Sequence, residues 1–397
     1  MSWKMFILVI ALICPLAAFT VEAPQKLTIW TSNENVRDAV KSVSAKFEKD
    51  FGVQVDVVVL NKDVKTQFQT AAMSGKGPDI LSWAHDVTGE LAASGLIEPI
   101  KVSKDLKAAY FPVALEAFTY QGKVYGYPYD MEAVALFYNK KLISAPPKTM
   151  EELISWSKEF AKKEPKKHAF LYDLSNLFFS YSFLSAGGGY VFKMNAKGFD
   201  PTNIGLANKG AVEGAELILQ FVNEGIIPET TDRSVAINKM KKNELAMTID
   251  GPWTVKELLK SGVDFGVAPI PLYKGNRPKP FVGVHGFFIR RSSDKKDLAK
   301  ALIENYLVTK QGIIDLYKMD PRGPARKDVM SDLKDEKYLS AFMESIQAGH
   351  PMPNVPQMAS VWGSVGASLG LVVTKKKAPK EALEAAVKQI QQNVSQK

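Results

Sequence analysis

An α/β fold made of two lobes is the fold class that this sequence predicts, and three observations support it. The chain has 397 residues, more than a single compact core usually serves. Short apolar runs typical of strands alternate with segments of helical periodicity, which is the pattern of a parallel sheet covered by helices. Hydrophobic residues make up 46% of the chain and charged residues 23%, as in ordinary soluble globular proteins.

The alternation is clearest between residues 26 and 83. Apolar residues recur at helical spacing from Val36 to Phe51, and Gly52 ends that helix. A valine-rich strand follows, and then a helix that contains Phe68 and stops at Gly75. The expected elements are, in order, a strand at 26–30, a helix at 36–51, a strand at 53–60, a helix around 68–72 and a strand at 79–83.

The same rhythm continues toward the C-terminus. Thr149 and Glu152 form a capping box, in which two side chains satisfy free N–H groups at the start of a helix. Proline and glycine at 321–324 mark a loop. Further strands are expected at 124–129, 133–138 and 245–249, and further helices at 150–163, 211–223, 236–242, 295–308 and 381–392, before a polar tail.

The first residues of the chain predict a secretory signal peptide. Lys4 precedes an unbroken apolar run at 5–13, and small residues follow it. The run is too short to span a bilayer as a permanent anchor. We expect residues 1–23 to be removed by cleavage between Ala18 and Ala23, which places the mature protein in the periplasm.

The only cysteine, Cys14, lies inside the expected signal peptide. The mature chain would therefore contain no cysteine, and it would form no disulfide and carry no thiol chemistry. A lipid anchor at Cys14 is the alternative, although a lipidated cysteine needs a small residue before it and Ile13 is not small.

The net charge of +9 does not indicate a nucleic-acid partner. The 51 lysine and arginine residues are spread along the chain, and dense runs such as 375–377 are short and lack interleaved aromatic residues. We interpret the excess as a solvated basic surface.

Sequence signatures of catalysis are missing, with one alternative left open. The four histidines, at 85, 168, 285 and 350, are scattered and have no cysteine partners, so we expect no metal site and no cofactor. The sequence has no P-loop and no Gly-x-Ser-x-Gly nucleophile motif. A carboxylate pair for glycoside hydrolysis depends on spatial separation, so a secreted glycosidase remains the alternative from another class.

The segment at 75–86 carries a more specific signal. A glycine turn feeds a buried strand that ends in Trp83 and Asp86, and in a parallel sheet that end of the strand faces the ligand crevice. This segment resembles the periplasmic maltodextrin-binding proteins. Seven other segments resemble the same family in the same order, from about Lys26 to Gln392: 47–50, 138–140, 146–149, 187–190, 246–253, 279–284 and 352–358.

The resemblance implies a two-lobed periplasmic-binding-protein fold with the ligand cleft between the lobes. A hinge would close the cleft, because only the closed state lets both lobes touch the ligand. It also implies a monomer that is not an enzyme and that delivers a maltose- or maltodextrin-type oligosaccharide to the membrane permease of an ABC importer. By analogy the first lobe takes 24–131 and 285–331, the second takes 132–284 and 332–397, and the chain crosses near 130–131, 283–285 and 321–324.

Sugar binding calls for aromatic rings that stack on the C–H face of a pyranose and for carboxylates that accept hydrogen bonds from its hydroxyl groups. The resemblance supplies both kinds of residue. Phe178 replaces a stacking tyrosine of the family, and Glu34 replaces a shorter aspartate. The implied stacking residues are Trp83, Phe178, Trp253 and Trp362, and the implied hydroxyl-binding acids are Glu34, Asp86 and Glu132.

Each role has a structural alternative. Trp253 fits a core residue after a turn, and Glu132 fits an ion pair that stabilises the hinge. Glu34 fits a negative charge that favours a helix N-terminus.

The chain also departs from the family at several positions. Asn35, Val87 and Gly366 stand where the family has basic residues. The stacking residues are therefore kept better than the hydrogen-bonding ones, so the exact sugar stays open. A different oligosaccharide is the alternative within the class, and an adhesin or scaffold that has lost its ligand is a third possibility.

Overall fold

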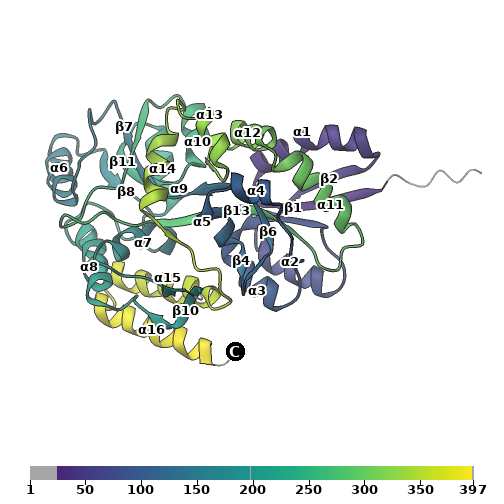
Figure 1. Cartoon of the computed structure of the whole chain (residues 1–397). Helices are drawn as coiled ribbons and strands as arrows, with labels where there is room; N and C mark the ends of the chain where they lie inside the picture. Colours follow the sequence, from purple (N-terminus) through teal and green to yellow (C-terminus); the bar gives the residue numbers. More distant parts are fainter. Residues whose placement is uncertain (1–24, 197, 396–397) are drawn as a thin grey trace, which may run out of the picture.

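The computed structural model describes residues 25–196 and 198–395. The expected signal peptide at 1–23, with Cys14, lies outside the described residues. Two halves lie side by side in Figure 1, each built on its own β-sheet with helices packed around it. The α/β, two-lobed fold class predicted from the sequence is confirmed.

The larger sheet combines parallel and antiparallel pairs. In spatial order its strands are β14 (Gly323–Pro324), β6 (Gly126–Glu132), β13 (Phe281–Ile289), β3 (Ile80–Ala84), β1 (Lys26–Thr31) and β2 (Gln54–Val59), with β15 (His350–Pro351) beside β13. β1 pairs in parallel with β2 and β3, as the strand–helix alternation predicts. β13 runs antiparallel to β3 and β6, because a distant part of the chain returns through the middle of the sheet.

The smaller sheet belongs to the other half. Its strands are β12 (Phe265–Ala268), β7 (Ala135–Asn139), β11 (Leu245–Asp250) and β8 (His168–Leu171), in that spatial order. β11 is parallel to β8, whereas β7 is antiparallel to both β11 and β12. Two hairpins stand apart from these sheets: β4 (Thr119–Tyr120) with β5 (Lys123–Val124), and β9 (Phe192–Asn195) with β10 (Gly198–Ile204).

Helices surround both sheets (Figure 1). In the first half they are α1 (Glu34–Phe51), α2 (Val64–Met73), η1 (His85–Val87), α3 (Thr88–Ala93), α4 (Lys104–Ala109), α5 (Pro112–Ala117), α11 (Lys296–Leu302), η2 (Ile303–Leu307), α12 (Lys310–Met319) and α13 (Lys327–Asp332). The others are α6 (Met150–Lys163), α7 (Leu177–Ala186), α8 (Lys209–Asn223), α9 (Arg233–Lys241), α10 (Thr254–Lys260), α14 (Leu339–Ala348), α15 (Met358–Val373) and α16 (Pro379–Ser395).

Local sequence signals explain several helix ends. Gly52 follows α1 in the left-handed conformation, with φ of 65°, as the expected stop requires. Thr149 caps α6 by accepting from the N–H of Glu152 at 3.1 Å. The carboxylate of Glu152 accepts from the N–H of Lys148 at 2.7 Å, one residue before the donor that a capping box predicts. The helix expected at 295–308 is divided into α11 and the π-helical segment η2.

Two hydrophobic cores correspond to the two sheets. Buried side chains belong to the first core up to Ala133 and to the second core from Val134. The chain returns to the first core between Phe281 and Val282, at the start of β13. The helix α14 contributes buried side chains to both cores. Two of these changes of core lie near the crossings expected at 130–131 and 283–285, whereas the third falls at α14 rather than at 321–324, since Ala325 and Val329 still belong to the first core. The lobe boundaries stay predictions.

Candidate functional site

Three of the four predicted stacking residues lie together, linked by Phe281. The ring centroid of Phe178 on α7 lies 5.9 Å from that of Trp253 and 6.2 Å from that of Phe281. Trp362 on α15 meets Phe281 edge-on, with 5.6 Å between ring centroids. Phe178, Trp253 and Trp362 are all partly buried, so each ring keeps some accessible surface. Segments distant in sequence thus form one aromatic platform, which we define as Phe178, Trp253 and Trp362.

The backbone positions two rings of the aromatic platform. Oδ1 of Asn176 accepts a hydrogen bond from the N–H of Phe178 at 3.0 Å, which caps α7 and fixes its first turn. The indole of Trp253 lies over Gly251, where an added Cβ would approach a ring atom to 2.1 Å. A side chain at Gly251 would therefore displace the ring of Trp253.

Asp86 contacts the aromatic platform directly. It lies in η1, just beyond the end of β3, and its Oδ2 accepts a hydrogen bond from Nε1 of Trp362 at 3.1 Å. Burial raises the pKa of Asp86 to about 6, and the hydrogen bond from Trp362 offsets only part of that effect. The carboxyl group is therefore mainly ionised at neutral pH and becomes protonated in mild acid.

Trp83 lies beside a small cavity rather than on the platform. The cavity has a volume of about 90 Å³, well below the range of about 300–1,000 Å³ typical of ligand pockets. A sugar ring would enter only if the segments around the cavity moved apart. Polar side chains that line the cavity with Trp83 include Asn33, Ser82, Tyr129, His285 and Arg322.

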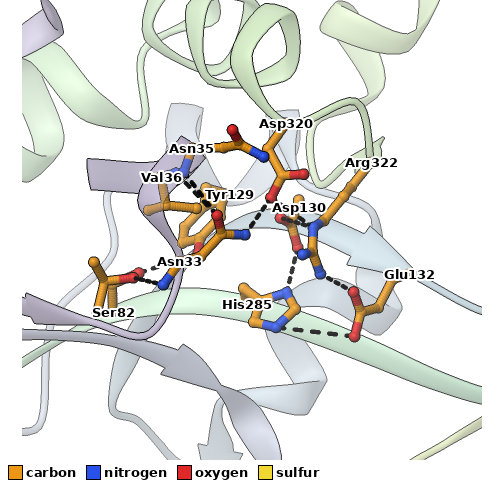
Figure 2. Close-up of polar contacts among 11 residues, drawn as sticks. Asn33, Asn35, Val36, Ser82, Tyr129, Asp130, Glu132, His285, Asp320 and Arg322 are labelled. Carbon is orange, nitrogen blue, oxygen red and sulfur yellow. Dashed lines mark hydrogen bonds and ion pairs between the residues drawn. The ribbon is translucent and has the colours of Figure 1, made fainter. Parts of the chain in front are cut away.

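A group of charged side chains lies where β6, β13 and the loop after α12 meet (Figure 2). We call Asp130, Glu132, His285, Asp320 and Arg322 the charged cluster. Arg322 donates to Glu132 through Nη1 and to Asp320 through Nε, the latter at 2.9 Å. Nδ1 of His285 lies 2.8 Å from Oδ1 of Asp130. Asp130, Glu132, Asp320 and Arg322 are each at most 7% exposed, so these charges depend on one another rather than on water.

Opposite charges in the cluster stabilise the ionised basic groups. Burial alone would lower the pKa of His285, but the carboxylates of Asp130 and Glu132 outweigh it and hold that pKa above its usual value. Burial also opposes the charge of Arg322, whose pKa is nevertheless raised by Glu132, Asp320 and Asp130. For Glu132 burial is the larger effect and raises the pKa, against the pull of Arg322 and His285.

Arg322 joins the charged cluster to the aromatic platform. Its guanidinium carbon lies 5.5 Å from the ring centroid of Trp253, within the range of a cation–π contact. Glu132, predicted to bind sugar hydroxyl groups, is thereby engaged in an ion pair, as its structural alternative proposed. Five of the seven predicted site residues are connected through Arg322, Phe281 or direct contacts, and Trp83 lines the same cavity as Arg322.

Glu34 is the predicted site residue that the structure leaves apart. It is the exposed first residue of α1, and within 25–196 and 198–395 no residue forms a hydrogen bond or ion pair with its carboxylate. Its position at the N-terminus of α1 fits the alternative role of a charge that favours the helix.

Gly366, which stands where the resembled family has a basic residue, has open space around it. A Cβ on Gly366 would meet only the carbonyl oxygen of Ser175, at 3.6 Å, and a Cβ on Gly363 would meet nothing within 4 Å. Val87 is instead buried in the first core. The face of α15 next to Trp362 is therefore open, including at Gly366, where the resembled family has a basic residue.

Sequence reasoning missed Arg322, His285 and Phe281. Arg322 lies in a loop between proline and glycine, where an arginine usually signals only a solvated turn. His285 stands alone in the sequence, since its partner Asp130 is 155 residues away. The available signal was that Arg322 and His285 lie at crossing points expected between the lobes, and that Phe281 lies two residues before one of them.

A larger cavity of about 340 Å³ lies elsewhere, between the β9–β10 hairpin and β15. Tyr181, Tyr190, Phe192, Lys193 and Lys279 are among its lining residues, which include no carboxylate and none of the predicted site residues. This cavity therefore offers rings and basic groups but no carboxylate, the acceptor that gives charge-assisted hydrogen bonds to sugar hydroxyl groups.

Comparison with known proteins establishes the family. Residues 42–341 match the family described as bacterial extracellular solute-binding protein. The chain belongs to this family. The resemblance to sugar-binding members of ABC importers, stated from the sequence, is confirmed at about 30% identity.

Similar curated solute-binding proteins cover most of the chain. It is 31% identical over 374 residues to the galactooligosaccharide-binding protein of Bacillus subtilis (strain 168), a match that spans 91% of this chain and 87% of that protein. It is 30% identical over 354 residues to the maltotriose-binding protein of Pyrococcus abyssi (strain GE5 / Orsay), spanning 86% and 75%. The maltodextrin-binding protein MdxE of B. subtilis is 28% identical over 387 residues, spanning 94% and 91%.

These relatives are binding proteins rather than enzymes. Among the described residues of this solute-binding protein, no helix has both the length and the apolar character needed to cross a membrane. The same residues contain no group of three or more histidine, cysteine or acidic side chains placed to hold a metal ion.

Proposed function

We propose that this solute-binding protein captures a maltodextrin-type oligosaccharide and delivers it to the permease subunits of an ABC importer. The observation that carries the proposal is the contact between Trp362 and Asp86, which brings a stacking ring and a hydroxyl acceptor to one place. Phe178 and Trp253 extend the aromatic surface beside them, so that consecutive sugar rings can stack.

Residues from both halves of the chain contribute to the proposed site. Asp86 and Trp83 belong to the half built on the larger sheet, whereas Phe178 and Trp253 pack against the second core. A sugar that touches residues of both halves favours the arrangement in which the two halves are closed on each other. Hinge movement at the segments between the cores would open the site so that the sugar can enter. The lobe boundaries and the monomeric state stay predictions.

The names of the relatives support an oligosaccharide ligand and leave two candidates. Maltotriose and maltodextrin appear in two of the names, and galactooligosaccharide in a third. We favour the maltodextrin ligand because the segments that carry the family resemblance include Trp83, Asp86 and Trp253. A galactooligosaccharide is the second candidate because its binding protein matches 91% of this chain.

Tryptophan fluorescence followed by calorimetric titration tests the proposal. The probes are maltose, maltotriose, maltotetraose and a galactotriose, with cellotriose as a β-glucan control. Saturable binding of a maltodextrin without release of shorter sugars supports the proposal. Preferential binding of galactotriose selects the second candidate, binding to none of the five removes the oligosaccharide function, and hydrolysis of a bound sugar revives the glycosidase alternative.

Export through the signal peptide is part of the same proposal. A solute-binding protein meets its ligand only outside the cytoplasmic membrane, and residues 1–23 have the composition of a signal peptide. We expect N-terminal sequencing of protein from the cell envelope to find a first residue between 19 and 24. An intact Met1 on that protein would contradict the export route.

A further inference from the structure

Arg322 lies between Trp253, which belongs to the aromatic platform, and the small cavity beside Trp83. It comes from the loop between α12 and β14, and it is 7% exposed. Its guanidinium carbon lies 5.5 Å from the ring centroid of Trp253, and its side chain also lines the cavity beside Trp83. Within the described part of the chain, Arg322 and His285 are the basic side chains that line that cavity, and Arg322 is the one placed over the ring of Trp253.

Three carboxylates fix the orientation of Arg322. Nε donates to Oδ2 of Asp320 at 2.9 Å and lies 3.7 Å from Oδ2 of Asp130, while Nη1 donates to Glu132. Figure 2 shows these acids gathered around the guanidinium. Within 25–196 and 198–395, no residue accepts a hydrogen bond from Nη2. Two nitrogens of the planar group are thus held by acids, and the third still has donors to offer.

We propose that Arg322 is a sugar-binding residue that donates from Nη2 to a hydroxyl oxygen of the ring stacked on Trp253. This inference rests on the proposed function and names a specificity determinant of the same site. Asn35, Val87 and Gly366 stand where the resembled family has basic residues, so a cationic donor to the sugar would have to come from another segment. Arg322 supplies one, and the carboxylates keep its planar group aligned so that the hydrogen bond costs little side-chain entropy.

The arrangement of the charged cluster suits ligand binding better than a role in stabilising the fold alone. Three buried carboxylates surround Arg322, and two of them also face His285, so each is held in a dense arrangement of opposite charges at a desolvation cost. A guanidinium held on one side by several acids, with a donor left over on the other, is preorganised toward a ligand. The positioning residues in this arrangement are Asp130, Glu132 and Asp320.

Titration calorimetry with maltotriose tests the assignment on two matched variants. Arg322→Lys keeps the positive charge near the acids but removes the planar fork, and we expect the Kd for maltotriose to rise at least tenfold. Arg326→Lys is the control, since Arg326 lies four residues further along and is held by Asp328 and the carbonyl oxygen of Val308, away from Trp253. We expect that control to change the Kd less than twofold.

A series of monodeoxy maltotrioses separates binding from a structural role. In the unmodified protein, loss of the hydroxyl that Arg322 binds weakens affinity by a large factor, and in Arg322→Lys the same deoxygenation has little further effect. If Arg322→Lys weakens all the sugars by one common factor, Arg322 only supports the fold and the inference is wrong. Unchanged maltotriose binding by Arg322→Lys overturns it as well.

A measurement on the unmodified protein covers the case in which Arg322→Lys does not fold. With ¹⁵N-labelled arginine, the guanidinium signals of Arg322 should shift when maltotriose is added, while those of Arg326 stay in place. Binding of maltotriose without any shift at Arg322 refutes the inference and leaves the proposed function intact. Failure to bind any oligosaccharide in the panel refutes the proposed function itself, so the two failures are distinguishable.

Discussion

Nε1 of Trp362 donates a hydrogen bond to Oδ2 of Asp86 at 3.1 Å, across 276 positions of the sequence. The ring that we propose for stacking and the carboxylate that we propose as a hydroxyl acceptor thereby contact each other directly. A sugar hydroxyl that donates to Asp86 must either share the carboxylate with the indole or replace it. Because a carboxylate has two oxygens and several acceptor positions, sharing is possible, and the indole then holds the acid in place for the sugar.

The titration of Asp86 predicts a pH dependence of sugar binding. Burial raises its pKa to about 6, so the group loses its negative charge as the pH falls through that value. Hydroxyl donors favour the ionised form, so binding should release a proton and weaken from pH 7.5 to pH 5. Calorimetric titration with maltotriose across this range measures the trend. In Asp86→Asn, affinity should be lower at pH 7.5 and should depend less on pH, and an equal slope in both proteins would contradict the role of Asp86.

Removal of single rings from the aromatic platform should weaken binding. We expect Trp253→Ala and Trp362→Ala each to cost at least about 1 kcal/mol of binding free energy, the lower end for large aromatic residues at interfaces. Trp156→Ala is a matched control, because Trp156 on α6 stacks on Phe160 and lies outside the site. Titration with maltotriose gives the three values, and equal losses in all three variants would mean that ring removal acts through general destabilisation.

Much of the secondary structure was predictable because its signals are local. The helix expected at 150–163 has those bounds in α6, since Thr149 marks its start by a contact three residues away. The long helix expected at 295–308 was only partly right, because the change to π-helical geometry in η2 has no simple periodic signal. Strand pairing was harder to predict. The antiparallel placement of β13 depends on partners more than 100 residues away, and apolar runs carry no direction.

The residues of the candidate site came from the family resemblance rather than from local sequence signals. Trp362 and Asp86 were expected in one site, and the structure brings them into contact. Arg322 was not expected, because its role arises from a loop folding against Trp253, and nothing in the adjacent proline and glycine indicates that contact. Long-range charge pairs such as His285 with Asp130 are similarly invisible until the strands are paired.

Protonated His285 should stabilise the fold. Its pKa is raised above 6.5 because Asp130 and Glu132 outweigh burial, so the stabilisation is fully present below about pH 6.5 and is lost as the pH rises through the pKa of the folded state. His285→Gln should lower the free energy of unfolding by about 1.5–3 kcal/mol at pH 6, the range for a hydrogen bond to a charged group. The cost should be smaller at pH 9.

Urea unfolding at both pH values measures the effect of His285→Gln. His168→Gln is the control, because burial lowers the pKa of His168 and its charge therefore does not stabilise the fold. A cost for His285→Gln that grows from pH 6 to pH 9 would show that His285 is neutral in the folded protein.

Ligand length is the last prediction. Phe178, Trp253 and Trp362 offer stacking surface for several consecutive rings, whereas basic partners are missing at Asn35 and Gly366. A hydrogen bond to a charged group contributes roughly 1.5–3 kcal/mol, so the loss of one weakens a disaccharide by about tenfold or more. A longer chain offsets part of that loss by covering more aromatic surface. We therefore expect maltotriose and maltotetraose to bind more tightly than maltose in calorimetric titration.

Restoring a basic side chain should reduce this preference for longer chains. A Cβ on Gly366 would have only the carbonyl oxygen of Ser175 within 4 Å, so Gly366→Arg fits on α15 and can place a cation near the platform. We expect it to strengthen maltose binding more than maltotetraose binding. Gly370→Arg, one turn further along the same helix and also in open space, is the control for added charge.

Tightest binding to maltose by the unmodified protein would contradict the expected preference for longer sugars. A disaccharide would then gain from anchoring contacts that are expected to be missing.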